Sequence, residues 1–294
     1  MIKGHARYTK LICQTSTSVQ GFCSEGKEIT MIIEAKQWWE KHATEYQRQC
    51  RIPIDILYGP GAPNEDELQL IGPVAGKHVL EIGCGGAQAA TAFAKRGAVV
   101  TGMDIAEAQL RFARDLAAQE GIEIRLFQGD MADLGPVATA SQDVVFSACA
   151  FGYVADLLAC FAEVHRVLKP TGRFVWSVGH PFNQVLDSHD PKGLGIIRSY
   201  FDTGVQIEGA TDTPGEAFAS VNRTISDYFD LLTQTGFVVE RLVEPDSRKR
   251  YACDPWYGLW DTTPERCAKI PRTIIFKCRK NQESTLPGGS NEGE

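Results

Sequence analysis

The central part of the chain alternates short apolar runs with longer segments in which apolar residues recur at helical spacing. The short runs have the length and the β-favouring composition of strands, and they lie at residues 78–82, 99–103, 123–128, 142–149 and 173–178. The segments between them predict helices, at residues 87–95, 106–118 and 157–168. Alternating strands and helices indicate a parallel sheet covered by helices on both faces.

The pattern changes after the fifth of these strands, where the connection is longer than a loop between neighbouring elements needs. Residues 196–201 and 217–223 predict two strands of a β-ribbon, within an insertion that spans residues 181–225. Long insertions at the ligand-binding edge of a sheet commonly carry specificity, so this segment is expected to cover the substrate. The pattern ends with a helix at 226–234 and strands at 237–243 and 273–278.

The two ends of the chain are less regular than its centre. Residues 1–30 mix Ser, Thr, Gly and Lys without a sustained period, and they are expected to form a poorly ordered extension. Residues 35–49 predict a helix that packs on the core. Residues 281–294 are rich in Gly, Ser, Asn and Glu and are expected to be a disordered tail. The folded domain is therefore expected to span residues 31–280.

Composition narrows the class of protein. The 294 residues are 43% hydrophobic and 23% charged, which suits one large globular domain. The formal net charge of −7 argues against a large nucleic-acid-binding surface. No apolar run approaches the roughly 18 to 20 residues of a membrane span. The nine cysteines form no CxxC pair and no Cys/His ligand spacing, so they indicate a reducing cytoplasm and no metal site.

A glycine turn follows the first predicted strand. Gly83, Cys84, Gly85 and Gly86 stand directly before a helix, so bare backbone N–H groups and a positive helix N-terminus can approach a ligand. A dinucleotide-binding turn, G-x-G-x-x-G/A, needs a small residue at its sixth position, where this chain has Gln88. This difference disfavours a nicotinamide-dependent oxidoreductase, which stays an alternative.

Further signals follow at the ends of the predicted strands. Glu81 precedes the glycines in an E-x-G-x-G pattern, and the helix at 157–168 is followed by a Lys-Pro-Thr-Gly stop at 169–172. With Asp104 and Asp130 at two other strand ends, the chain resembles class I S-adenosylmethionine (SAM)-dependent methyltransferases over roughly residues 38–280. The resemblance implies an α/β fold with a doubly wound, mostly parallel seven-stranded sheet, helices on both faces and an antiparallel last strand. It also implies an N-terminal helical lid within residues 31–75, besides the β-ribbon after strand five.

The same resemblance implies SAM as the cofactor, bound beyond the carboxyl ends of the strands. Asp104 lies roughly 20 residues past the glycines, where a carboxylate can accept hydrogen bonds from both ribose hydroxyls; a helix N-cap is the alternative. Asp130 is expected at the adenine amino group and Met131 against the ring, with an ordinary turn as the alternative. The expected cofactor contacts are Glu81, Gly83, Cys84, Gly85, Asp104, Ile105, Gly129, Asp130, Met131 and Ala148.

Candidates for the methyl acceptor's site lie on the loops at strand ends and on the lid. His180 ends the fifth strand, where a general base could reach the acceptor, although a hydrogen-bonded turn histidine is the alternative. Tyr153 could donate a hydrogen bond to the acceptor or pack in the core. Trp256 lies in an aromatic loop and is a further candidate. The expected substrate-binding residues are Trp38, Tyr46, Tyr58, Phe151, Asn183 and Tyr200.

Together these features predict a cytoplasmic methyltransferase that moves the methyl group of SAM to an O, N or C atom of a small, apolar or aromatic molecule. A nicotinamide-dependent oxidoreductase and a SAM-binding regulatory protein without catalysis remain alternatives. The expected partner is a small molecule and not nucleic acid. The sequence does not distinguish the three acceptor atoms or predict an oligomeric state.

Overall fold

The computed structural model describes residues 25–187, 194–209, 213, 215–249, 254–256 and 263–281. A seven-stranded sheet lies at its centre, in the strand order β3-β2-β1-β4-β5-β9-β8. Its strands are β1 (His78–Ile82), β2 (Val99–Asp104), β3 (Arg125–Gln128), β4 (Gln142–Ala148), β5 (Leu168–Gly179), β8 (Phe237–Val243) and β9 (Thr273–Lys280). Strands β1 to β5 are parallel, and β9 is antiparallel to both β5 and β8. The predicted fold class is therefore confirmed, including the antiparallel last strand.

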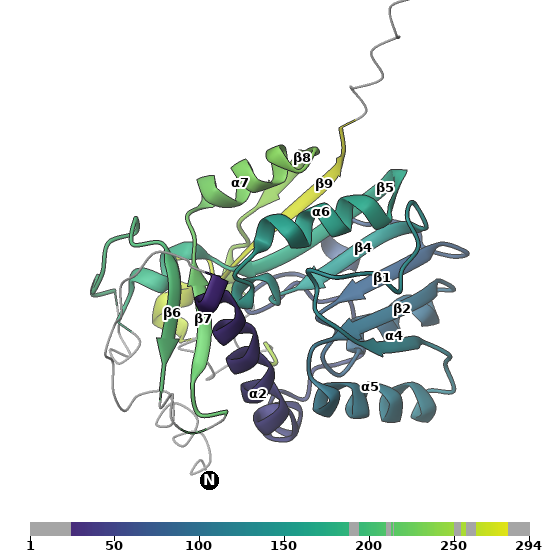
Figure 1. Ribbon diagram of the computed structural model, residues 1–294, viewed down its shortest axis with the longest axis horizontal. Helices are drawn as coiled ribbons and strands as arrows, with labels where there is room; N and C mark the ends of the chain where they lie inside the picture. Colours follow the sequence, from purple (N-terminus) through teal and green to yellow (C-terminus); the bar gives the residue numbers. More distant parts are fainter. Residues whose placement is uncertain are drawn as a thin grey trace, which may run out of the picture.

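Helices cover both faces of this sheet (Figure 1). On one face, α6 (Leu157–Val167) and α7 (Ile225–Gln234) bury a cluster centred on Trp176, whose indole stacks on Phe276 at 4.4 Å. On the other face, α4 (Gln88–Lys95) and α5 (Glu107–Gln119) bury a second cluster. The alternating apolar and helical periods of the sequence account for this arrangement, because each helix has one apolar side to cover.

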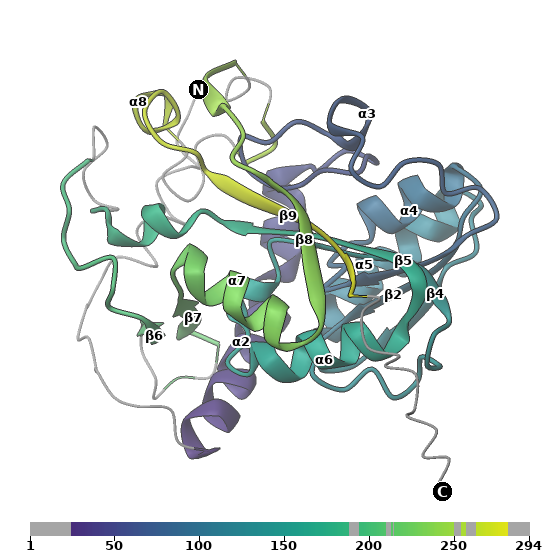
Figure 2. The same cartoon turned by 90° about the horizontal axis from the view of Figure 1, so that it is seen from above.

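A second layer lies over one end of the sheet (Figures 1 and 2). It consists of the long helix α2 (Glu25–Cys50) and a ribbon of two antiparallel strands, β6 (Gly204–Glu208) and β7 (Phe218–Asn222). Trp38 of α2 packs edge-on against Phe218 of β7, with ring centroids 4.9 Å apart, and Lys41 forms an ion pair with Glu216. The helix and the ribbon thus form one continuous cover, which we call the cap.

The short elements complete the description. They are α3 (Glu65–Leu68), η1 (Phe151–Tyr153), η2 (Pro181–Val185), η3 (Ser247–Lys249) and α8 (Pro264–Cys267). Helix α2 begins at Glu25, so it overlaps the extension expected at residues 1–30; residues 1–24 and 282–294 lie outside the described part of the chain. No described helix is both long enough and apolar enough to cross a membrane.

The prediction of a ribbon strand at residues 196–201 is wrong. In this stretch Ile196 forms one isolated bridge to Leu186, and the first strand of the ribbon is β6, further along the chain. The apolar run misled the prediction because Ile196, Ile197 and Phe201 are exposed, by 67%, 55% and 81%. In the ribbon itself, side chains of β6 pack against buried Ala219 and Val221. Alternate residues of β7 are therefore buried, as expected for a strand with one covered face.

The sequence predicted that residues 169–172 end the preceding helix as a separate turn. The structure instead places these residues inside β5. Leu168 pairs with Gln142, whereas the next pair joins Arg173 to Val144. The residues between form an irregularity within the strand and make no separate turn.

Candidate functional site

A cavity lies beyond the carboxyl ends of β1, β2 and β4, between the sheet and the cap. Such a position is expected for a ligand site, because the strand order reverses between β1 and β4. One half of the cavity is formed by the glycine turn and the ends of these strands. The other half is aromatic and is formed by α2, η1 and Trp256. We call these parts the cofactor half and the acceptor half.

Two buried carboxylates face the cofactor half. Asp104 accepts hydrogen bonds from the backbone N–H of Gly85 at 2.8 Å and of Ala106 at 2.9 Å. Glu81 accepts one from the N–H of Ala90 at 2.7 Å, in the first turn of α4. Burial raises the pKa of Asp104 to about 6 and that of Glu81 to about 8. Within the described residues neither carboxylate has a salt-bridge partner, so both suit a ligand that brings positive charge and hydroxyl donors.

The glycine turn needs its first glycine for steric reasons. Gly83 has φ +66°, and a Cβ there would lie 2.4 Å from the Cβ of Ala150. Gln47 of α2 lies over the same turn, because a Cβ on Gly86 would come within 2.8 Å of its amide. The Gln47 side chain donates to Gln109 at 2.8 Å and accepts from Gln88 at 2.7 Å. The cap therefore contacts the turn directly.

Glu40 of α2 supplies a helix cap that α5 lacks. The residue before α5 is Ala106, whose side chain cannot accept a hydrogen bond. The two carboxylate oxygens of Glu40 instead accept from the N–H groups of Glu107 at 2.7 Å and Ala108 at 2.9 Å. Because α5 starts directly after Asp104 and Ile105, this contact ties the cap to the cofactor half.

Aromatic rings line the acceptor half. Trp39 meets Tyr46 and Tyr153 edge-on, with centroid distances of 5.3 and 5.8 Å. The indole N–H of Trp256 donates to the Tyr46 hydroxyl at 3.0 Å. The Tyr153 hydroxyl forms no hydrogen bond with another described residue, and burial raises the pKa of Tyr153 well above its usual range. Burial also raises the pKa of the nearby Cys149 thiol, to about 12, so both groups stay protonated at neutral pH.

Most of the predicted cofactor contacts converge on this cavity. Those that line it are Glu81, Gly83, Cys84, Gly85, Asp104, Ile105, Asp130, Met131 and Ala148. Gly129 lies behind it and donates its N–H to the backbone carbonyl of Asp104 at 3.1 Å. Burial raises the pKa of the Cys84 thiol well above its usual range, so this side chain acts by its size.

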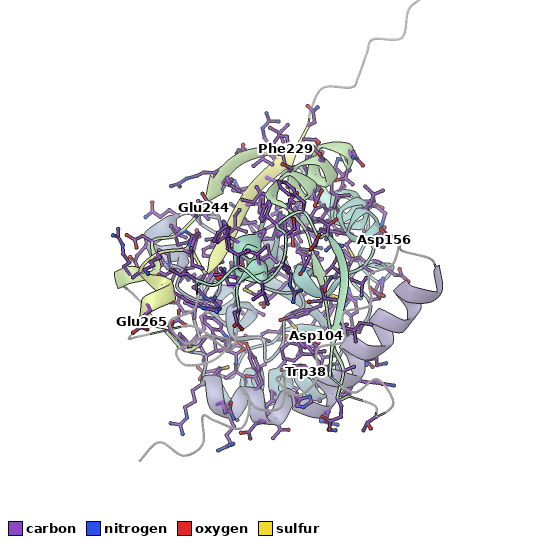
Figure 3. The ribbon with its side chains drawn as sticks, turned by 90° about the vertical axis from the view of Figure 1, so that its left-hand side faces the viewer. Trp38, Asp104, Asp156, Phe229, Glu244 and Glu265 are labelled. Atoms are coloured by element: carbon purple, nitrogen blue, oxygen red, sulfur yellow. The ribbon has the colours of Figure 1, made fainter. Side chains whose placement is uncertain are left out.

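Three predicted acceptor-site residues are engaged elsewhere. His180 accepts from the N–H of Phe182 through Nδ1, and its Nε2 bonds Glu244 at 2.7 Å. Glu244 lies well apart from Asp104 in Figure 3, and His180 does not line the cavity. Asn183 donates to the carbonyl of His180, and the Tyr200 hydroxyl accepts from the N–H of Ile225 at the start of α7. These bonds fit a structural role for each side chain.

The other predicted substrate residues divide in the same way. Tyr46 and Tyr153 line the cavity. Tyr58 instead donates a hydrogen bond from its hydroxyl to the buried carboxylate of Glu65. The same carboxylate also accepts hydrogen bonds from three backbone N–H groups in the segment before β1. Phe151 is fully buried in the core cluster, and Trp38 packs on the ribbon.

Sequence reasoning missed Trp39, Glu40 and Gln47. Trp39 and Tyr46 are seven residues apart and therefore lie on one helical face, a signal that was available in the sequence. The sequence could not show which of the two neighbouring tryptophans faces the cavity, because this depends on the ribbon. Trp38 packs against Phe218 of the ribbon, and Trp39 lines the cavity. Glu40 gave no local signal, since it caps a helix 67 residues further along the chain.

Comparisons with known proteins agree with this geometry. Residues 80–176 match the family model described as a methyltransferase domain. The ubiquinone biosynthesis O-methyltransferase of Ruegeria pomeroyi is 30% identical over 232 residues, which cover 77% of this chain and 85% of that protein. The chain therefore belongs to the class I SAM-dependent methyltransferase family, with SAM as cofactor, and the oxidoreductase alternative is rejected.

Further relatives agree on the class and the fold. The ubiquinone biosynthesis O-methyltransferase of Pseudomonas syringae pv. tomato is 36% identical over 143 residues, covering 49% of this chain and 58% of that protein. The crystal structure of a SAM-dependent methyltransferase from Mesorhizobium loti superposes with a TM-score of 0.60 at 24% identity, covering 72% of this chain and 95% of that one. This likeness concerns the fold.

The first prediction concerns Glu81, whose folded pKa of about 8 lies above its unfolded value. The folded protein then holds a proton that the unfolded chain releases, so this group's contribution to stability falls as pH rises towards 8. Glu81→Gln, whose amide oxygen still accepts from Ala90, should gain stability relative to the wild type by about 1–3 kcal/mol between about pH 5 and 8. Urea unfolding of the cofactor-free proteins at both pH values measures this, with the exposed Glu123→Gln as control. Equal pH slopes in wild type and Glu81→Gln contradict the assignment.

The second prediction concerns the cap. Glu40→Ala should lower the free energy of unfolding by about 1 kcal/mol, the usual cost of losing a helix cap. It should also speed hydrogen exchange at the N–H groups of Glu107 and Ala108, which mass spectrometry with peptide resolution detects. Glu45→Ala is the control, because Glu45 pairs with Arg48 on the exposed side of α2. Unchanged exchange in the first turn of α5 would show that Glu40 is not its cap.

Proposed function

We propose that this protein is an O-methyltransferase that acts on a small phenolic molecule. The observation that carries the proposal is Tyr153, a residue that lines the aromatic half of the cavity and whose hydroxyl forms no hydrogen bond with another described residue. Aromatic walls suit a planar ring, and an unpaired hydroxyl suits a polar atom on that ring. The choice of oxygen as acceptor atom is supported by the relatives from Ruegeria pomeroyi and Pseudomonas syringae, which are O-methyltransferases.

In this proposal the cofactor half holds SAM through the side chains at the strand ends. Asp104 accepts from the ribose hydroxyls with the lone pairs that Gly85 and Ala106 leave free. Asp130 and Met131 take the adenine, and Glu81 and the glycine turn take the cationic methionine end. The raised pKa values of Asp104 and Glu81 support this assignment, because a positive ligand would favour their ionised forms.

The chemical step needs alignment more than it needs side-chain chemistry. Bound SAM would supply an activated methyl group whose leaving group, the thioether sulfur, keeps the electron pair of the broken C–S bond, so the acceptor oxygen needs only a lone pair. The phenolic proton is lost to bulk water before the acceptor enters the site. Tyr153 donates a hydrogen bond to the acceptor oxygen and fixes the direction of its lone pair. Trp39, Tyr46 and Trp256 hold the ring and exclude water.

This proposal uses Tyr153 as a donor and gives His180 no part in proton transfer. The raised pKa of Tyr153 keeps its hydroxyl protonated, so it cannot remove a proton at neutral pH. His180 is bonded at both ring nitrogens and does not line the cavity. The rate should therefore follow the ionisation of the acceptor itself.

The third prediction tests the ribose assignment. Asp104→Ala should weaken binding of S-adenosylhomocysteine by about 1.5–3 kcal/mol, the range of charge-assisted hydrogen bonds. Titration calorimetry measures the affinity, and circular dichroism confirms that the variant is folded. Asp115→Ala, on the exposed face of α5, is the control. An unchanged affinity in Asp104→Ala removes the assignment.

The fourth prediction tests the donor. Tyr153→Phe should lower kcat for a phenolic acceptor about ten- to a hundredfold, the effect of losing a hydrogen bond in the transition state, with little change in S-adenosylhomocysteine affinity. His180→Gln should leave the shape of the pH–rate profile unchanged when rates are normalised to the folded fraction. A profile that loses a basic limb in His180→Gln would make His180 the general base and refute this part of the proposal.

A further inference from the structure

The charged groups on the cavity wall all have one sign. The described lining contains no Lys, Arg or His. Its ionisable carboxyl residues are Asp55, Glu81, Asp104, Asp130 and Asp156. A cavity built in this way favours cations and neutral molecules over anions, because no side chain on its described wall carries a positive charge.

We infer that the methyl acceptor carries no permanent negative charge, and so is an uncharged aromatic molecule without a carboxylate, phosphate or sulfate group. The inference rests on the proposed function and narrows its substrate class. The charge of a phenolate at the reacting oxygen is a separate matter, since it forms on ionisation of the hydroxyl and disappears when the methyl group is transferred.

Bound cofactor would not reverse the excess of negative charge on the cavity wall in the acceptor half. SAM carries a sulfonium, an ammonium and a carboxylate, so it adds one net positive charge, and Glu81 and Asp104 border its site. Asp55 is paired with Arg96 at 3.4 Å. The rest of the described wall presents indole and phenol rings, aliphatic side chains, a thiol, backbone and two carboxylates (Asp55 and Asp156), and none of these can neutralise a carboxylate. A permanent anion would therefore lose its hydration there without gaining an ion pair.

Arg272 is a nearby cation, and it is already engaged behind the wall. It is buried, and its Nη1 donates to the side-chain oxygen of Asn183 at 2.6 Å. Its charge also interacts with that of Asp254, which accepts from the N–H groups of Gly61 and Trp256. Arg272 therefore balances Asp254 and does not line the cavity.

A permanently cationic acceptor fits less well than a neutral one. The acids of the wall would attract a cation, but the sulfonium at the reaction centre repels it at close range. An ammonium that is itself the methyl acceptor has no lone pair, and it would first need a base. The lack of a cationic side chain on the described wall disfavours an anion, and the sulfonium disfavours a cation. Together they favour an uncharged ring whose hydroxyl is the nucleophile.

The first test compares acceptors that share a catechol ring and differ in charge. With saturating SAM, kcat/KM should be at least about tenfold higher for the methyl ester of 3,4-dihydroxybenzoate than for the free carboxylate, and 4-methylcatechol should also exceed the carboxylate. Dopamine, a cation at neutral pH, should fall between 4-methylcatechol and the carboxylate. A carboxylate that reacts as well as its ester overturns the inference.

A second test needs no choice of acceptor. Methyl-labelled SAM is incubated with the enzyme and a detergent-solubilised metabolite extract, unreacted SAM is removed on a cation exchanger, and the remaining labelled products are passed over an anion exchanger at neutral pH. The label should appear in the unretained fraction. Label in the retained fraction overturns the inference and leaves the methyltransferase activity intact, whereas no enzyme-dependent label in any fraction overturns the proposed function together with the inference.

A charge variant tests the cause directly. Asp156→Asn removes one negative charge from the cavity wall and keeps the cap of α6, because the amide oxygen can still accept from the N–H of Ala159. The ratio of kcat/KM for the carboxylate to that for its ester should rise about two- to fourfold, the size expected for one charge at a partly screened distance. Asp115→Asn, on the outer face of α5, should leave the ratio unchanged. An equal ratio in Asp156→Asn and wild type would show that wall charge does not select the acceptor.

Discussion

The hydrogen bond from the Gly85 N–H to the Asp104 carboxylate is the contact on which the site depends. It joins the glycine turn after β1 to the end of the neighbouring strand β2, and the same carboxylate orders the start of α5 through Ala106. The turn and the acid are thus positioned by one another before any ligand arrives. The cost is a buried carboxylate without a cation, which is visible in the raised pKa of Asp104. In the proposed assignment of Asp104 to the ribose, a ligand that brings positive charge and hydroxyl donors offsets that cost.

The cap extends this dependence to the acceptor half. Helix α2 carries Trp39, which forms part of the aromatic wall, next to Glu40, which caps α5. Its other neighbour, Trp38, packs on the ribbon. Three consecutive residues therefore link the acceptor wall, the cofactor half and the inserted ribbon. The first turn of α5 and the ring of Trp39 are thus held by neighbouring residues of one helix.

The sequence predicted the fold correctly and named residues that the structure brings together in the cofactor half, because both depend on backbone position. Glycines, strand ends and the acids beside them occur at fixed places in a parallel sheet, so their spacing in the chain locates them in space. The acceptor half was harder to predict, because there the partner of a side chain decides its role. Tyr58 and His180 stand at plausible positions along the chain, but Glu65 and Glu244 bind their polar atoms. Those partners are 7 and 64 residues away in sequence, and no local sequence pattern predicts these hydrogen bonds. The first ribbon strand was predicted at residues 196–201 for a related reason. This segment, which includes Phe201, is exposed but is as apolar in sequence as a buried strand.

The two halves of the cavity act on their ligands by different physical means. In the cofactor half the proposed selection is by attraction, because the buried carboxylates have backbone N–H partners but no described ion-pair partner, and a ligand of opposite charge would stabilise them further. In the acceptor half, the described wall offers little attraction beyond ring contact and the Tyr153 hydroxyl. In our proposal selection there comes from exclusion, since placing an unpaired anion against aromatic rings can discriminate as strongly as a well-formed hydrogen bond. On this proposal one cofactor is bound tightly while several related rings are accepted, with the charge of the ring setting the limit.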